Sequence, residues 1–327
     1  MVDVSIIAVS YNTEKLLPRF FDSVRRLIDE NRELIFQIVV IDNASADNSR
    51  AILSNLIGEF PIPVQLLKSE INLGFGRANN VALQHCLGRY VLLLNTDAFV
   101  KEGSLSELLH YCDENPSVGV AGAKLVSEDG SLQPSCRRFP TPWRLFTTAV
   151  GIAHWFGKSS LLDDLTWPHD AIRECDWVPG CFYLVRRTSI DAVGLFDSRY
   201  FLYYEEVDHC KAVMDAGYKV IYHPAVTVIH LGGESAKSDG ALNSKSKQLS
   251  ALQIESEFLF MRKHYGLLGL ALHICGQALV FALRMVKCWI REQPKATGTS
   301  ATSQLYNELS LFRSGLRETR YGRIATR

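Results

Sequence analysis

The sequence has no excess of charge of either sign: its 327 residues carry 35 Lys and Arg against 35 Asp and Glu. A domain dedicated to nucleic-acid binding carries a basic surplus, so we expect no nucleic-acid partner. The eight cysteines are scattered, and no C-x-x-C pair occurs. We interpret them as free thiols, several of them packed as small apolar side chains, which favours a reducing compartment.

Two other signals are missing near the N-terminus. The chain runs from Met1 directly into VSIIAVSYN, without the basic region, long apolar run and cleavage site of an export signal. This stretch predicts a first strand. The residues that follow it, SYNTEKLLPRF, contain neither the G-x-G-x-x-G loop of nicotinamide-dependent enzymes nor a basic, Gly-rich triphosphate loop. A dehydrogenase and a nucleotidyltransferase are therefore both disfavoured.

What is present, up to about residue 230, is an alternation of short apolar runs and helical patterns. This alternation predicts an α/β domain over residues 1–240, with a mostly parallel, Rossmann-like sheet flanked by helices. The 47% hydrophobic content is enough for a full core. The predicted strands are residues 4–10, 38–42, 63–68, 90–95, 119–126 and 181–187.

The remaining segments have different signatures. Residues 127–176 contain several Pro and Trp residues, which predicts an irregular insertion that shapes a substrate pocket. Residues 232–247 are rich in Gly, Ser and Lys and predict a mobile loop. A C-terminal helical region follows over residues 241–327, with a first helix at 249–264.

A second helix, residues 267–291, has a narrow polar stripe on an otherwise apolar surface. The stripe favours a helix that lies in a membrane interface over one that spans the bilayer. A helix packed on the catalytic domain, with its stripe in water, is the alternative. The tail from Arg291 to Arg327 has seven basic residues against three Glu and would attract anionic headgroups. We therefore expect a peripheral protein at the cytoplasmic face of the inner or plasma membrane. The polar stripe consists of His273, Gln277, Arg284, Lys287 and Arg291.

Polar residues follow the early strands where each strand ends. Ligands of open α/β sheets bind beyond the carboxyl ends of strands, so these residues should share one rim. Asp42 can accept hydrogen bonds from ribose hydroxyls or a base N–H, or simply cap a helix. The rim residues are Ser10, Tyr11, Asn12, Asp42, Asn43 and Asp97.

The loop NLGFGRANN adds small and amide-bearing residues to this rim. Gly74 permits close backbone approach, and Asn72 and Asn79 offer amide donors and acceptors. Asp97 ends YVLLLNTD and suits a hard cation such as Mg²⁺ or Mn²⁺, which needs only one or two protein side chains when a diphosphate supplies the rest. His230 is a second candidate ligand or phosphate contact, and a structural histidine is the alternative.

Three acids open a predicted helix in YYEEVDHC. Acids in a first turn are favoured by the helix dipole, which gives Glu205, Glu206 and Asp208 a structural explanation. The aromatic run before them predicts a partly dry site, where the pKa of a carboxylate rises toward the working pH. Such a carboxylate can act as the base that deprotonates a sugar hydroxyl.

Seven motifs occur in the order seen in family 2 glycosyltransferases of the GT-A fold, over roughly residues 4–265. The chain resembles their rhamnosyltransferase-like branch, which builds bacterial surface polysaccharides. The resemblance implies an inverting, Mg²⁺- or Mn²⁺-dependent transfer from a dTDP- or UDP-sugar to a glycan or lipid-linked acceptor. The motifs are VSIIAVSYN, IDNASADNS, NLGFGRANN, LLLNTDAFV, WVPGCFYLVRR, GLFDSRYFLYYEEVDHC with GYKV, and VIHLGGES.

By this resemblance Asp42 is the nucleoside-binding acid, Asn72, Gly74 and Asn79 form the nucleotide-contacting loop, and Asp97 and His230 bind the metal. Glu206 takes the place of the base, with Glu205 as its neighbour, and Trp177 and Gly180 match the acceptor-side motif.

The sequence departs from the family pattern at two positions. Asn95 stands where many relatives have an acid, which puts the metal affinity in question and leaves a catalytically silent glycan-binding or scaffold subunit as the alternative function. Glu206 is one methylene longer than the usual Asp, which leaves open whether Glu206 or Asp208 takes the proton.

Overall fold

The computed structural model describes residues 1–157, 161–163, 165–232, 251–291 and 301–324. The chain divides into two compact units. The first consists of Met1–Arg138, Asp163–Ser198 and Glu205–Gly240. The second consists of Phe139–Leu162, Arg199–Tyr204 and Ala241–Arg327, so the C-terminal region is joined by two earlier segments of the chain.

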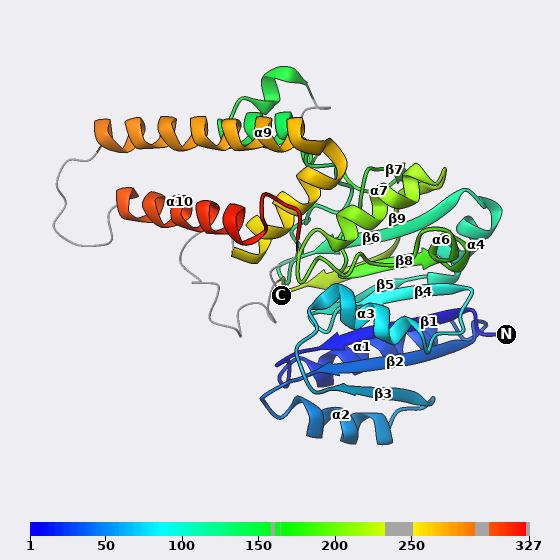
Figure 1. Cartoon of the computed structure of the whole chain (residues 1–327). Coiled ribbons are helices and arrows are strands. Elements are labelled where there is room, and N and C mark those ends of the chain that lie inside the picture. The colour runs from blue at the N-terminus through cyan, green and yellow to red at the C-terminus, as the bar shows by residue number, and fades with distance from the viewer. Residues whose placement is uncertain (158–160, 164, 233–250, 292–300, 325–327) are drawn as a thin grey trace. The chain divides into compact units, whose positions relative to one another are not determined.

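The first unit is built on a mixed sheet (Figure 1). Its strands are β1 (Val4–Ser10), β2 (Phe36–Asn43), β3 (Val64–Ser69), β4 (Tyr90–Leu94), β5 (Ala98–Gly103), β6 (Val118–Val126), β7 (Arg173–Glu174), β8 (Phe182–Arg186) and β9 (Lys219–His230). Their order is β3-β2-β1-β4-β8-β6-β9-β5, with β7 beside β9. The pairings make β3, β2, β1, β4, β6 and β9 run in one direction, while β8, β5 and β7 oppose them. The sheet is therefore mostly parallel, as predicted.

The strands form where the sequence supplies apolar runs that are covered on both faces. β4 is fully buried along its length, and β1 is buried except at Val9. This double burial produces continuous apolar runs instead of alternation, which is why the sequence located these strands well. All six predicted strands exist, within two residues at each end. β5, β7 and β9 were not predicted, because β5 ends in polar residues, β7 has only two residues, both exposed, and His223 and Pro224 interrupt the apolar pattern of β9.

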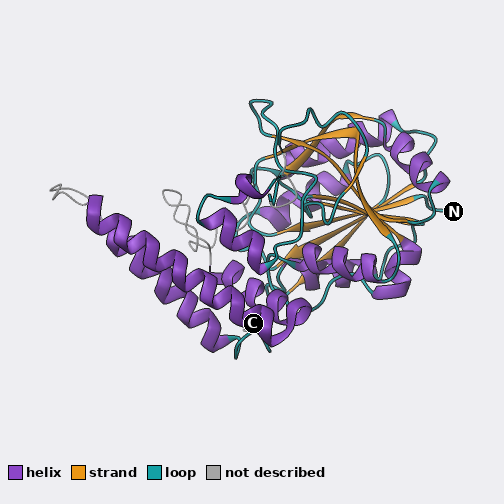
Figure 2. Ribbon diagram, turned by 90° about the horizontal axis from the view of Figure 1, so that it is seen from above, coloured by secondary structure: helices purple, strands orange, loops and turns teal. Residues whose placement is uncertain are grey.

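Helices cover both faces of the twisted sheet (Figure 2). In α1 the buried Leu17, Phe20, Val24 and Leu27 recur at helical spacing, and in α4 the side chain of Ser104 caps the N-terminus by accepting from the Glu107 N–H. The helices of this unit are α1 (Leu17–Glu30), α2 (Ser49–Gly58), α3 (Phe75–Leu83), α4 (Leu105–Glu114), α6 (Arg187–Val193) and α7 (Glu205–Asp215).

The second unit is helical. It contains α5 (Pro142–Ala149), the short 3₁₀ helix η1 (Ala153–Phe156), α9 (Ala251–Arg291) and α10 (Ala301–Glu318). α9 bends at Gly266, whose φ of 63° is not helical, so it comprises two helices that meet where the sequence placed the break between 264 and 267. α10 runs beside α9 (Figure 1) and occupies part of the predicted basic tail. The predicted loop at 232–247 lies outside the described residues except for Gly232.

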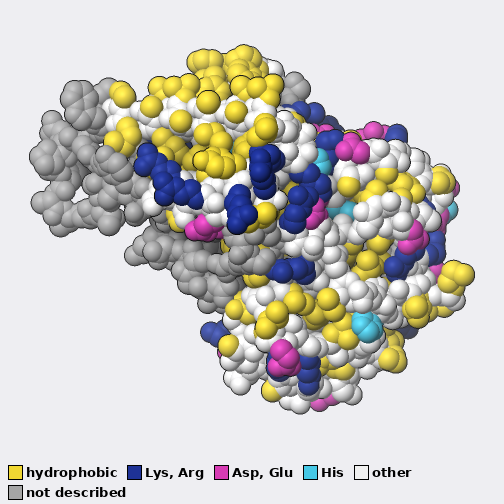
Figure 3. All heavy atoms as spheres, viewed as in Figure 1, with side chains coloured by type: hydrophobic (Ala, Val, Ile, Leu, Met, Phe, Trp, Pro, Cys, Tyr) yellow, Lys and Arg dark blue, Asp and Glu magenta, His cyan; other side chains and the backbone are white. Residues whose placement is uncertain are grey.

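One residue of the predicted polar stripe of α9 does not face water. His273 is only 2% exposed, and its Nε2 lies 2.7 Å from Oε1 of Glu257 in the first part of the same element. Arg284 of the same stripe is exposed. α9 also exposes an apolar face formed by Leu268, Leu272, Leu279, Leu283 and Val286, which we call the apolar stripe. Figure 3 shows apolar side chains along α9 with basic side chains beside them.

By length and composition α9 could cross a membrane: an 18-residue window within Ala251–Val286 has a mean hydropathy of 1.9. Buried core helices of soluble proteins pass the same test, but only 22% of this window is buried inside the protein. α9 therefore leaves the apolar stripe open on its surface.

Candidate active site

Strand pairing brings the predicted rim residues together. Ser10 is paired with Asp42 in the register of β1 and β2, and Asp42 is in turn paired with Lys68 of β3. Asn12 and Ala44, just past these strand ends, both have left-handed backbones, with φ of 51° and 65°. Strain of this kind in a non-glycine residue is typical of functional sites. The loops after β1 and β2 are also hydrogen-bonded to one another, since Asn12 accepts from the Ala46 N–H at 2.8 Å.

Asp42 is completely buried, and only one of its two carboxylate oxygens accepts hydrogen bonds from described residues. Its Oδ2 accepts from Nε of Arg50 at 2.5 Å and from the Ser45 N–H at 3.3 Å. Its Oδ1 is buried and accepts no hydrogen bond. An acceptor left without a donor is costly in a folded protein. This oxygen therefore suits a donor group of a ligand.

The loop before α3 is fixed to the end of β2 by Asn43. The Nδ2 of Asn43 donates to Oδ1 of Asn72 at 2.9 Å, and its Oδ1 accepts from the Leu73 N–H at 2.8 Å. Gly74 has a φ of 78°, which explains why a glycine stands there. Asn43, one of the predicted rim residues, thus holds this loop at the rim near Asp42.

Two predicted nucleotide contacts need correction. Asn79 is 1% exposed, and its Nδ2 donates to the Phe75 carbonyl one turn earlier, so it stabilises the start of α3 instead of offering an amide to a ligand. Ser10 is fully buried and hydrogen-bonded to Thr13 at 3.0 Å. Tyr11 and Asn12 keep partly exposed surface beside it and remain candidates.

Asp97 and His230 lie next to each other where β5 pairs with β9. Ala98 is the register partner of His230, and the Leu231 N–H donates to the Asp97 carbonyl at 3.0 Å. The Nε2 of His230 is 3.8 Å from Oδ1 of Asp97. The strand pairing therefore places Nε2 of His230 and Oδ1 of Asp97, two candidate metal ligands, next to each other.

Gln133 determines which nitrogen of His230 faces Asp97. Its Nε2 donates to the His230 carbonyl at 2.8 Å, so its Oε1, which can only accept, is left to face Nδ1 of the same ring at 3.1 Å. Nδ1 must then carry the hydrogen, and Nε2 keeps its lone pair toward Asp97. Burial lowers the pKa of His230 and outweighs the nearby Asp97 charge, which keeps the ring neutral.

This pair fits a divalent cation only as part of a larger ligand set. No group of three or more His, Cys, Asp or Glu side chains that could hold a metal occurs among the described residues. Mg²⁺ and Mn²⁺ accept mixed oxygen and imidazole ligands and take the remainder from phosphate oxygens and water. An oriented Nε2 beside a carboxylate oxygen satisfies that requirement, and ligating histidines usually have their other nitrogen fixed in this way.

The three acids at the start of α7 have different surroundings. Glu205 and Asp208 are 3% and 2% exposed, whereas Glu206 retains partly exposed surface. The chain enters this helix through Tyr203 and Tyr204, whose φ values of 71° and 69° are strained for tyrosine. A base must reach its substrate's proton, so of the three acids Glu206 is the best placed.

The carboxyl group of Glu206 is held in a dry position. Its Oε2 is buried and has no hydrogen-bond partner among the described residues. Burial raises the pKa of Glu206 above its usual value, and the opposing effects of nearby backbone N–H groups and of the Arg137 charge are smaller. Gly180 lies against it: a Cβ on Gly180 would be 3.8 Å from the Glu206 Cβ.

Trp177 and Gly180 meet Arg137 on this side of the site. The Arg137 guanidinium stacks over the Trp177 ring at 4.3 Å and pairs with both carboxylate oxygens of Asp163, at 2.5 and 3.0 Å. The Trp177 ring N–H donates to the Arg138 carbonyl. Arg137 therefore links the predicted acceptor-side motif to Glu206, on whose pKa its charge acts.

Asp97 and Glu206 are at the same end of the sheet. The Asn95 N–H donates to the Cys181 carbonyl at 3.0 Å, which joins the Asp97 turn to the residue after Gly180. Burial raises the pKa of the Cys181 thiol, and the charges of both Asp97 and Glu206 raise it further. The two carboxylates thus act on the same buried group, although they are more than 100 positions apart in the sequence.

Three contributors to the site were not identified from the sequence: Arg50, Gln133 and Arg137. Asn43 was predicted as a rim residue, next to Asp42, but without its contacts to the loop before α3. Gln133 and Arg137 lie in the irregular segment 127–176, where no periodicity indicates which side chains face inward. A general expectation that this segment shapes a pocket was the only signal available.

Comparison with known proteins identifies the first unit. Residues 5–159 match the family model "Glycosyl transferase family 2". The chain is 29% identical over 257 residues, 74% of this chain and 80% of the relative, to the N-acetylglucosaminyl-diphospho-decaprenol L-rhamnosyltransferase of Mycobacterium tuberculosis. It is 25% identical to the rhamnosyltransferase WbbL of Escherichia coli K12, over 72% of this chain and 86% of the relative.

Solved structures agree on the fold. GalNAc-T7, solved with UDP, GalNAc and Mn²⁺, superposes with a TM-score of 0.58 at 14% identity, over 98% of this chain and 57% of that one. The mannosyltransferase PcManGT of Pyrobaculum calidifontis, in complex with GDP-Man and Mn²⁺, gives 0.51 at 16% identity, over 97% and 84%. These likenesses establish the GT-A fold. Residues 5–159 therefore carry a glycosyltransferase family 2 domain.

Proposed function

We propose that this glycosyltransferase transfers a sugar from a nucleoside diphosphate sugar to a hydroxyl of a glycan or lipid-linked acceptor, with inversion and with the help of Mg²⁺ or Mn²⁺. The observation that carries the proposal is the joint placement of three groups. Asp97 lies beside His230, and the charges of both Asp97 and Glu206 raise the pKa of the Cys181 thiol, so that two candidate ligands and a dry carboxylate act near one turn.

The donor's nucleoside is assigned to the rim at Asp42. Its partnerless Oδ1 accepts from a base N–H or a ribose hydroxyl, and Arg50 holds the other oxygen in place. The loop with Asn72 and Gly74, which Asn43 holds by a hydrogen bond, lies beside Asp42. Gly74 has no side chain there, so the donor can approach the backbone of this loop closely. These residues would accept the nucleoside of a dTDP-sugar and that of a UDP-sugar equally well.

Asp97 and His230 are the residues that would hold the cation. When bound, the cation supplies Lewis-acid stabilisation to the negative charge of the departing diphosphate. Gln133 keeps His230 in the tautomer that presents a lone pair, and the buried setting keeps the ring neutral at physiological pH. Asn95 contributes no charge here, so the phosphates themselves complete the ligand set.

Glu206 acts as the base. Its buried Oε2, free of protein hydrogen bonds, accepts the proton of the acceptor hydroxyl as that oxygen attacks the anomeric carbon. Attack from the face opposite the diphosphate inverts the anomeric configuration. Gly180 packs against Glu206, and Trp177 with Arg137 forms the adjoining wall.

The relatives motivate the finer assignments. Two of them are named as rhamnosyltransferases, and one acts on a diphospho-decaprenol acceptor. A rhamnose donor and a lipid-linked acceptor are therefore the first substrates to test. The apolar stripe of α9 supports peripheral attachment to a membrane, and the free thiols of the described cysteines support its cytoplasmic face.

The test is a transfer assay with purified full-length protein and a panel of dTDP- and UDP-sugars, followed by mass spectrometry. Release of nucleoside diphosphate should require Mg²⁺ or Mn²⁺ and stop on chelation. Glu206→Gln should lower turnover by roughly 10²–10⁴-fold, the usual contribution of a general base, while donor affinity in calorimetry stays near that of the wild type.

Glu174→Gln is the matched control, because Glu174 is an exposed acid of β7 that pairs with Lys219 away from the site. It should keep wild-type turnover. Near-normal turnover of the Glu206 variant would remove that residue from the role of base. No release from any sugar nucleotide would favour the catalytically silent scaffold instead.

A further inference from the structure

The second unit contains a pocket that none of the proposed chemistry uses. It has a volume of about 410 Å³, within the range of small-molecule sites. Its lining comes from both sides of the Gly266 break in α9 and from the turn after α10. Arg262, Arg320 and Arg323 contribute charge to its lining, and Leu267 and Leu270 contribute apolar surface.

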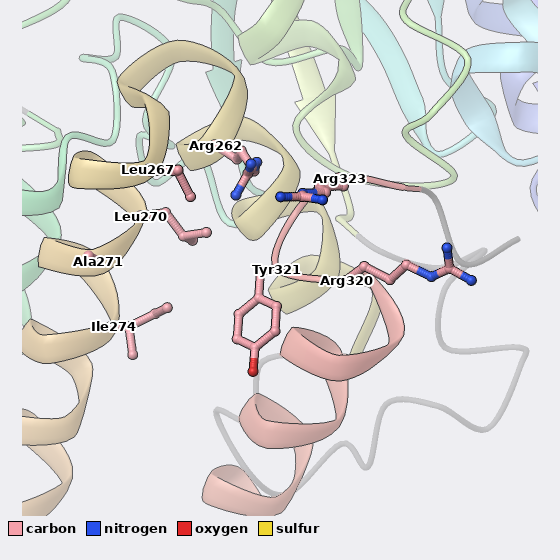
Figure 4. Close-up of a pocket in the computed structure, with 8 residues that line it drawn as sticks. All are labelled: Arg262, Leu267, Leu270, Ala271, Ile274, Arg320, Tyr321 and Arg323. Atoms are coloured by element: carbon pink, nitrogen blue, oxygen red, sulfur yellow. The ribbon is translucent and has the colours of Figure 1, made fainter.

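The arginines of this pocket have no counter-charge among the residues that the structure describes. No hydrogen bond or ion pair links any of the three guanidinium groups to another part of the described chain. Figure 4 shows the guanidinium groups of Arg262 and Arg323 pointing toward one another, from opposite sides of the pocket. Two like charges facing each other repel unless an anion lies between them. The arrangement therefore calls for an anionic ligand.

The turn that carries two of the arginines is a built feature. Arg320, Tyr321 and Gly322 are consecutive left-handed residues, with φ of 47°, 58° and 72°. A Cβ at Gly322 would lie 2.3 Å from the Phe258 carbonyl oxygen, so only glycine fits. The turn is tied back to α10 by Thr319, whose carbonyl accepts from the Arg323 N–H at 2.8 Å. Strain held in this way is characteristic of ligand-binding segments.

The apolar side of the pocket continues onto the membrane-facing surface that we propose for α9. Leu267 lines the pocket and is 64% exposed, and Leu268 and Leu272 extend the same exposed surface along the helix at 73% and 58%. A ligand with an anionic head and a hydrocarbon tail would fit both surfaces. Its head would lie at the arginines of the pocket, and its tail would lie on the exposed leucines of α9.

We infer that the pocket binds the phosphate headgroup of an anionic membrane phospholipid, whose acyl chains lie along the apolar stripe. The site rests on the proposed membrane attachment and would fix the position of the second unit at the bilayer surface. Guanidinium groups pair with phosphate oxygens through two parallel hydrogen bonds, which gives a specific contact in addition to general attraction.

The test compares binding of the full chain to vesicles of phosphatidylcholine alone and with 20 mol% phosphatidylglycerol. The variant is Arg262→Gln with Arg323→Gln, and the matched control is Arg313→Gln with Arg317→Gln, two exposed arginines of α10 outside the pocket. At about fivefold per arginine, the pocket variant should lose roughly 25-fold in affinity for the anionic vesicles, and the control no more than about fivefold.

Binding to neutral vesicles through the apolar stripe should be equal for all three proteins, and transfer to a water-soluble acceptor should be unchanged. That readout separates failure of the pocket from failure of the catalytic proposal. Equal losses in both variants would reduce the effect to diffuse charge attraction and overturn the inference. So would selective binding only to neutral vesicles that contain a few mol% of a polyprenyl diphosphate, because the pocket would then belong to the acceptor. Absence of binding to every vesicle would overturn it as well.

Discussion

At the scale of single residues, the burial of Glu206 sets the pH dependence of the reaction. Its raised pKa means that the base is still protonated at pH values where an ordinary glutamate, with a pKa of 4.5, is already charged. We therefore expect kcat/KM to fall on acidification through this raised value. The measurement is a pH–rate profile with saturating metal. An acidic limb at or below pH 4.5 would contradict the assignment.

The same burial also affects the stability of the fold. Most carboxylates stabilise a folded protein when they are charged, whereas the charged form of Glu206 destabilises it. A folded-state pKa above the unfolded value means that folding is penalised once Glu206 is charged, above the raised pKa, and is not penalised below about 4.5. Glu206→Gln should therefore raise the melting temperature at neutral pH, and this gain should disappear below pH 4.5. Thermal melts of both proteins across this range measure it. A gain that is independent of pH would mean that ionisation is not its cause.

Gln133 is a positioning residue for His230. Gln133→Leu removes the acceptor that fixes the Nδ1 hydrogen, so Mn²⁺ affinity in the presence of a nucleoside diphosphate should fall about 10–100-fold. Electron paramagnetic resonance of free Mn²⁺ gives the affinity without an activity assay. Ser127→Ala, which removes only one support of Gln133, is the control and should have a smaller effect. Unchanged Mn²⁺ binding in the Leu variant would exclude this role.

At the scale of elements, the pairing of β5 with β9 places both candidate metal ligands. This pairing contains a register shift between Val100 and Glu102, and it ends at Gly103, which has a φ of 122° and would place a Cβ 2.0 Å from the Ala225 carbonyl oxygen. Gly103→Ala should lower stability by about 1–3 kcal/mol or more and weaken Mn²⁺ binding with it.

Gly58→Ala is the matched control for that substitution. Gly58 ends α2, has ordinary φ, and a Cβ there would meet nothing within 4 Å. Alanine is the better helix residue by up to about 1 kcal/mol, so this variant should be as stable as the wild type or slightly more stable. Urea titrations of both variants compare the two. A Gly103 variant as stable as the Gly58 variant would show that the end of β5 can shift.

At the scale of the whole molecule, the apolar stripe should determine where the enzyme is found. Leu268→Ser with Leu272→Ser removes two exposed leucines of α9 and should lower binding to neutral vesicles by about tenfold or more. Transfer to a soluble acceptor should continue, since the catalytic residues lie in the first unit. Ile35→Ser with Leu87→Ser, two equally exposed apolar residues of the first unit, should leave vesicle binding unchanged. Equal binding by both double variants would argue against the stripe as the attachment surface.

The sequence by itself determined six of the nine strands, the polar residues at the carboxyl ends of the early strands and the family motifs. Each of these depends on a local pattern: a run of apolar residues buried on both faces, or a short motif after a strand. The break in α9 at Gly266 was also predicted from the sequence, because the helical pattern of residues 249–264 ends there and a separate one begins at 267.

The tertiary structure decided the rest, because it depends on contacts between distant segments. Gln133 and His230 are separated by 97 positions, and no local pattern links them. The surroundings of Glu206 and Asp208 separate these two acids, because Glu206 is partly exposed and Asp208 is buried. The side-chain amide of Asn79 donates to the Phe75 carbonyl of its own helix. The polar stripe of α9 follows from local periodicity, but the burial of His273 beside Glu257 and the exposure of Leu268 and Leu272 depend on which segments the helix packs against, and only the tertiary structure decides that.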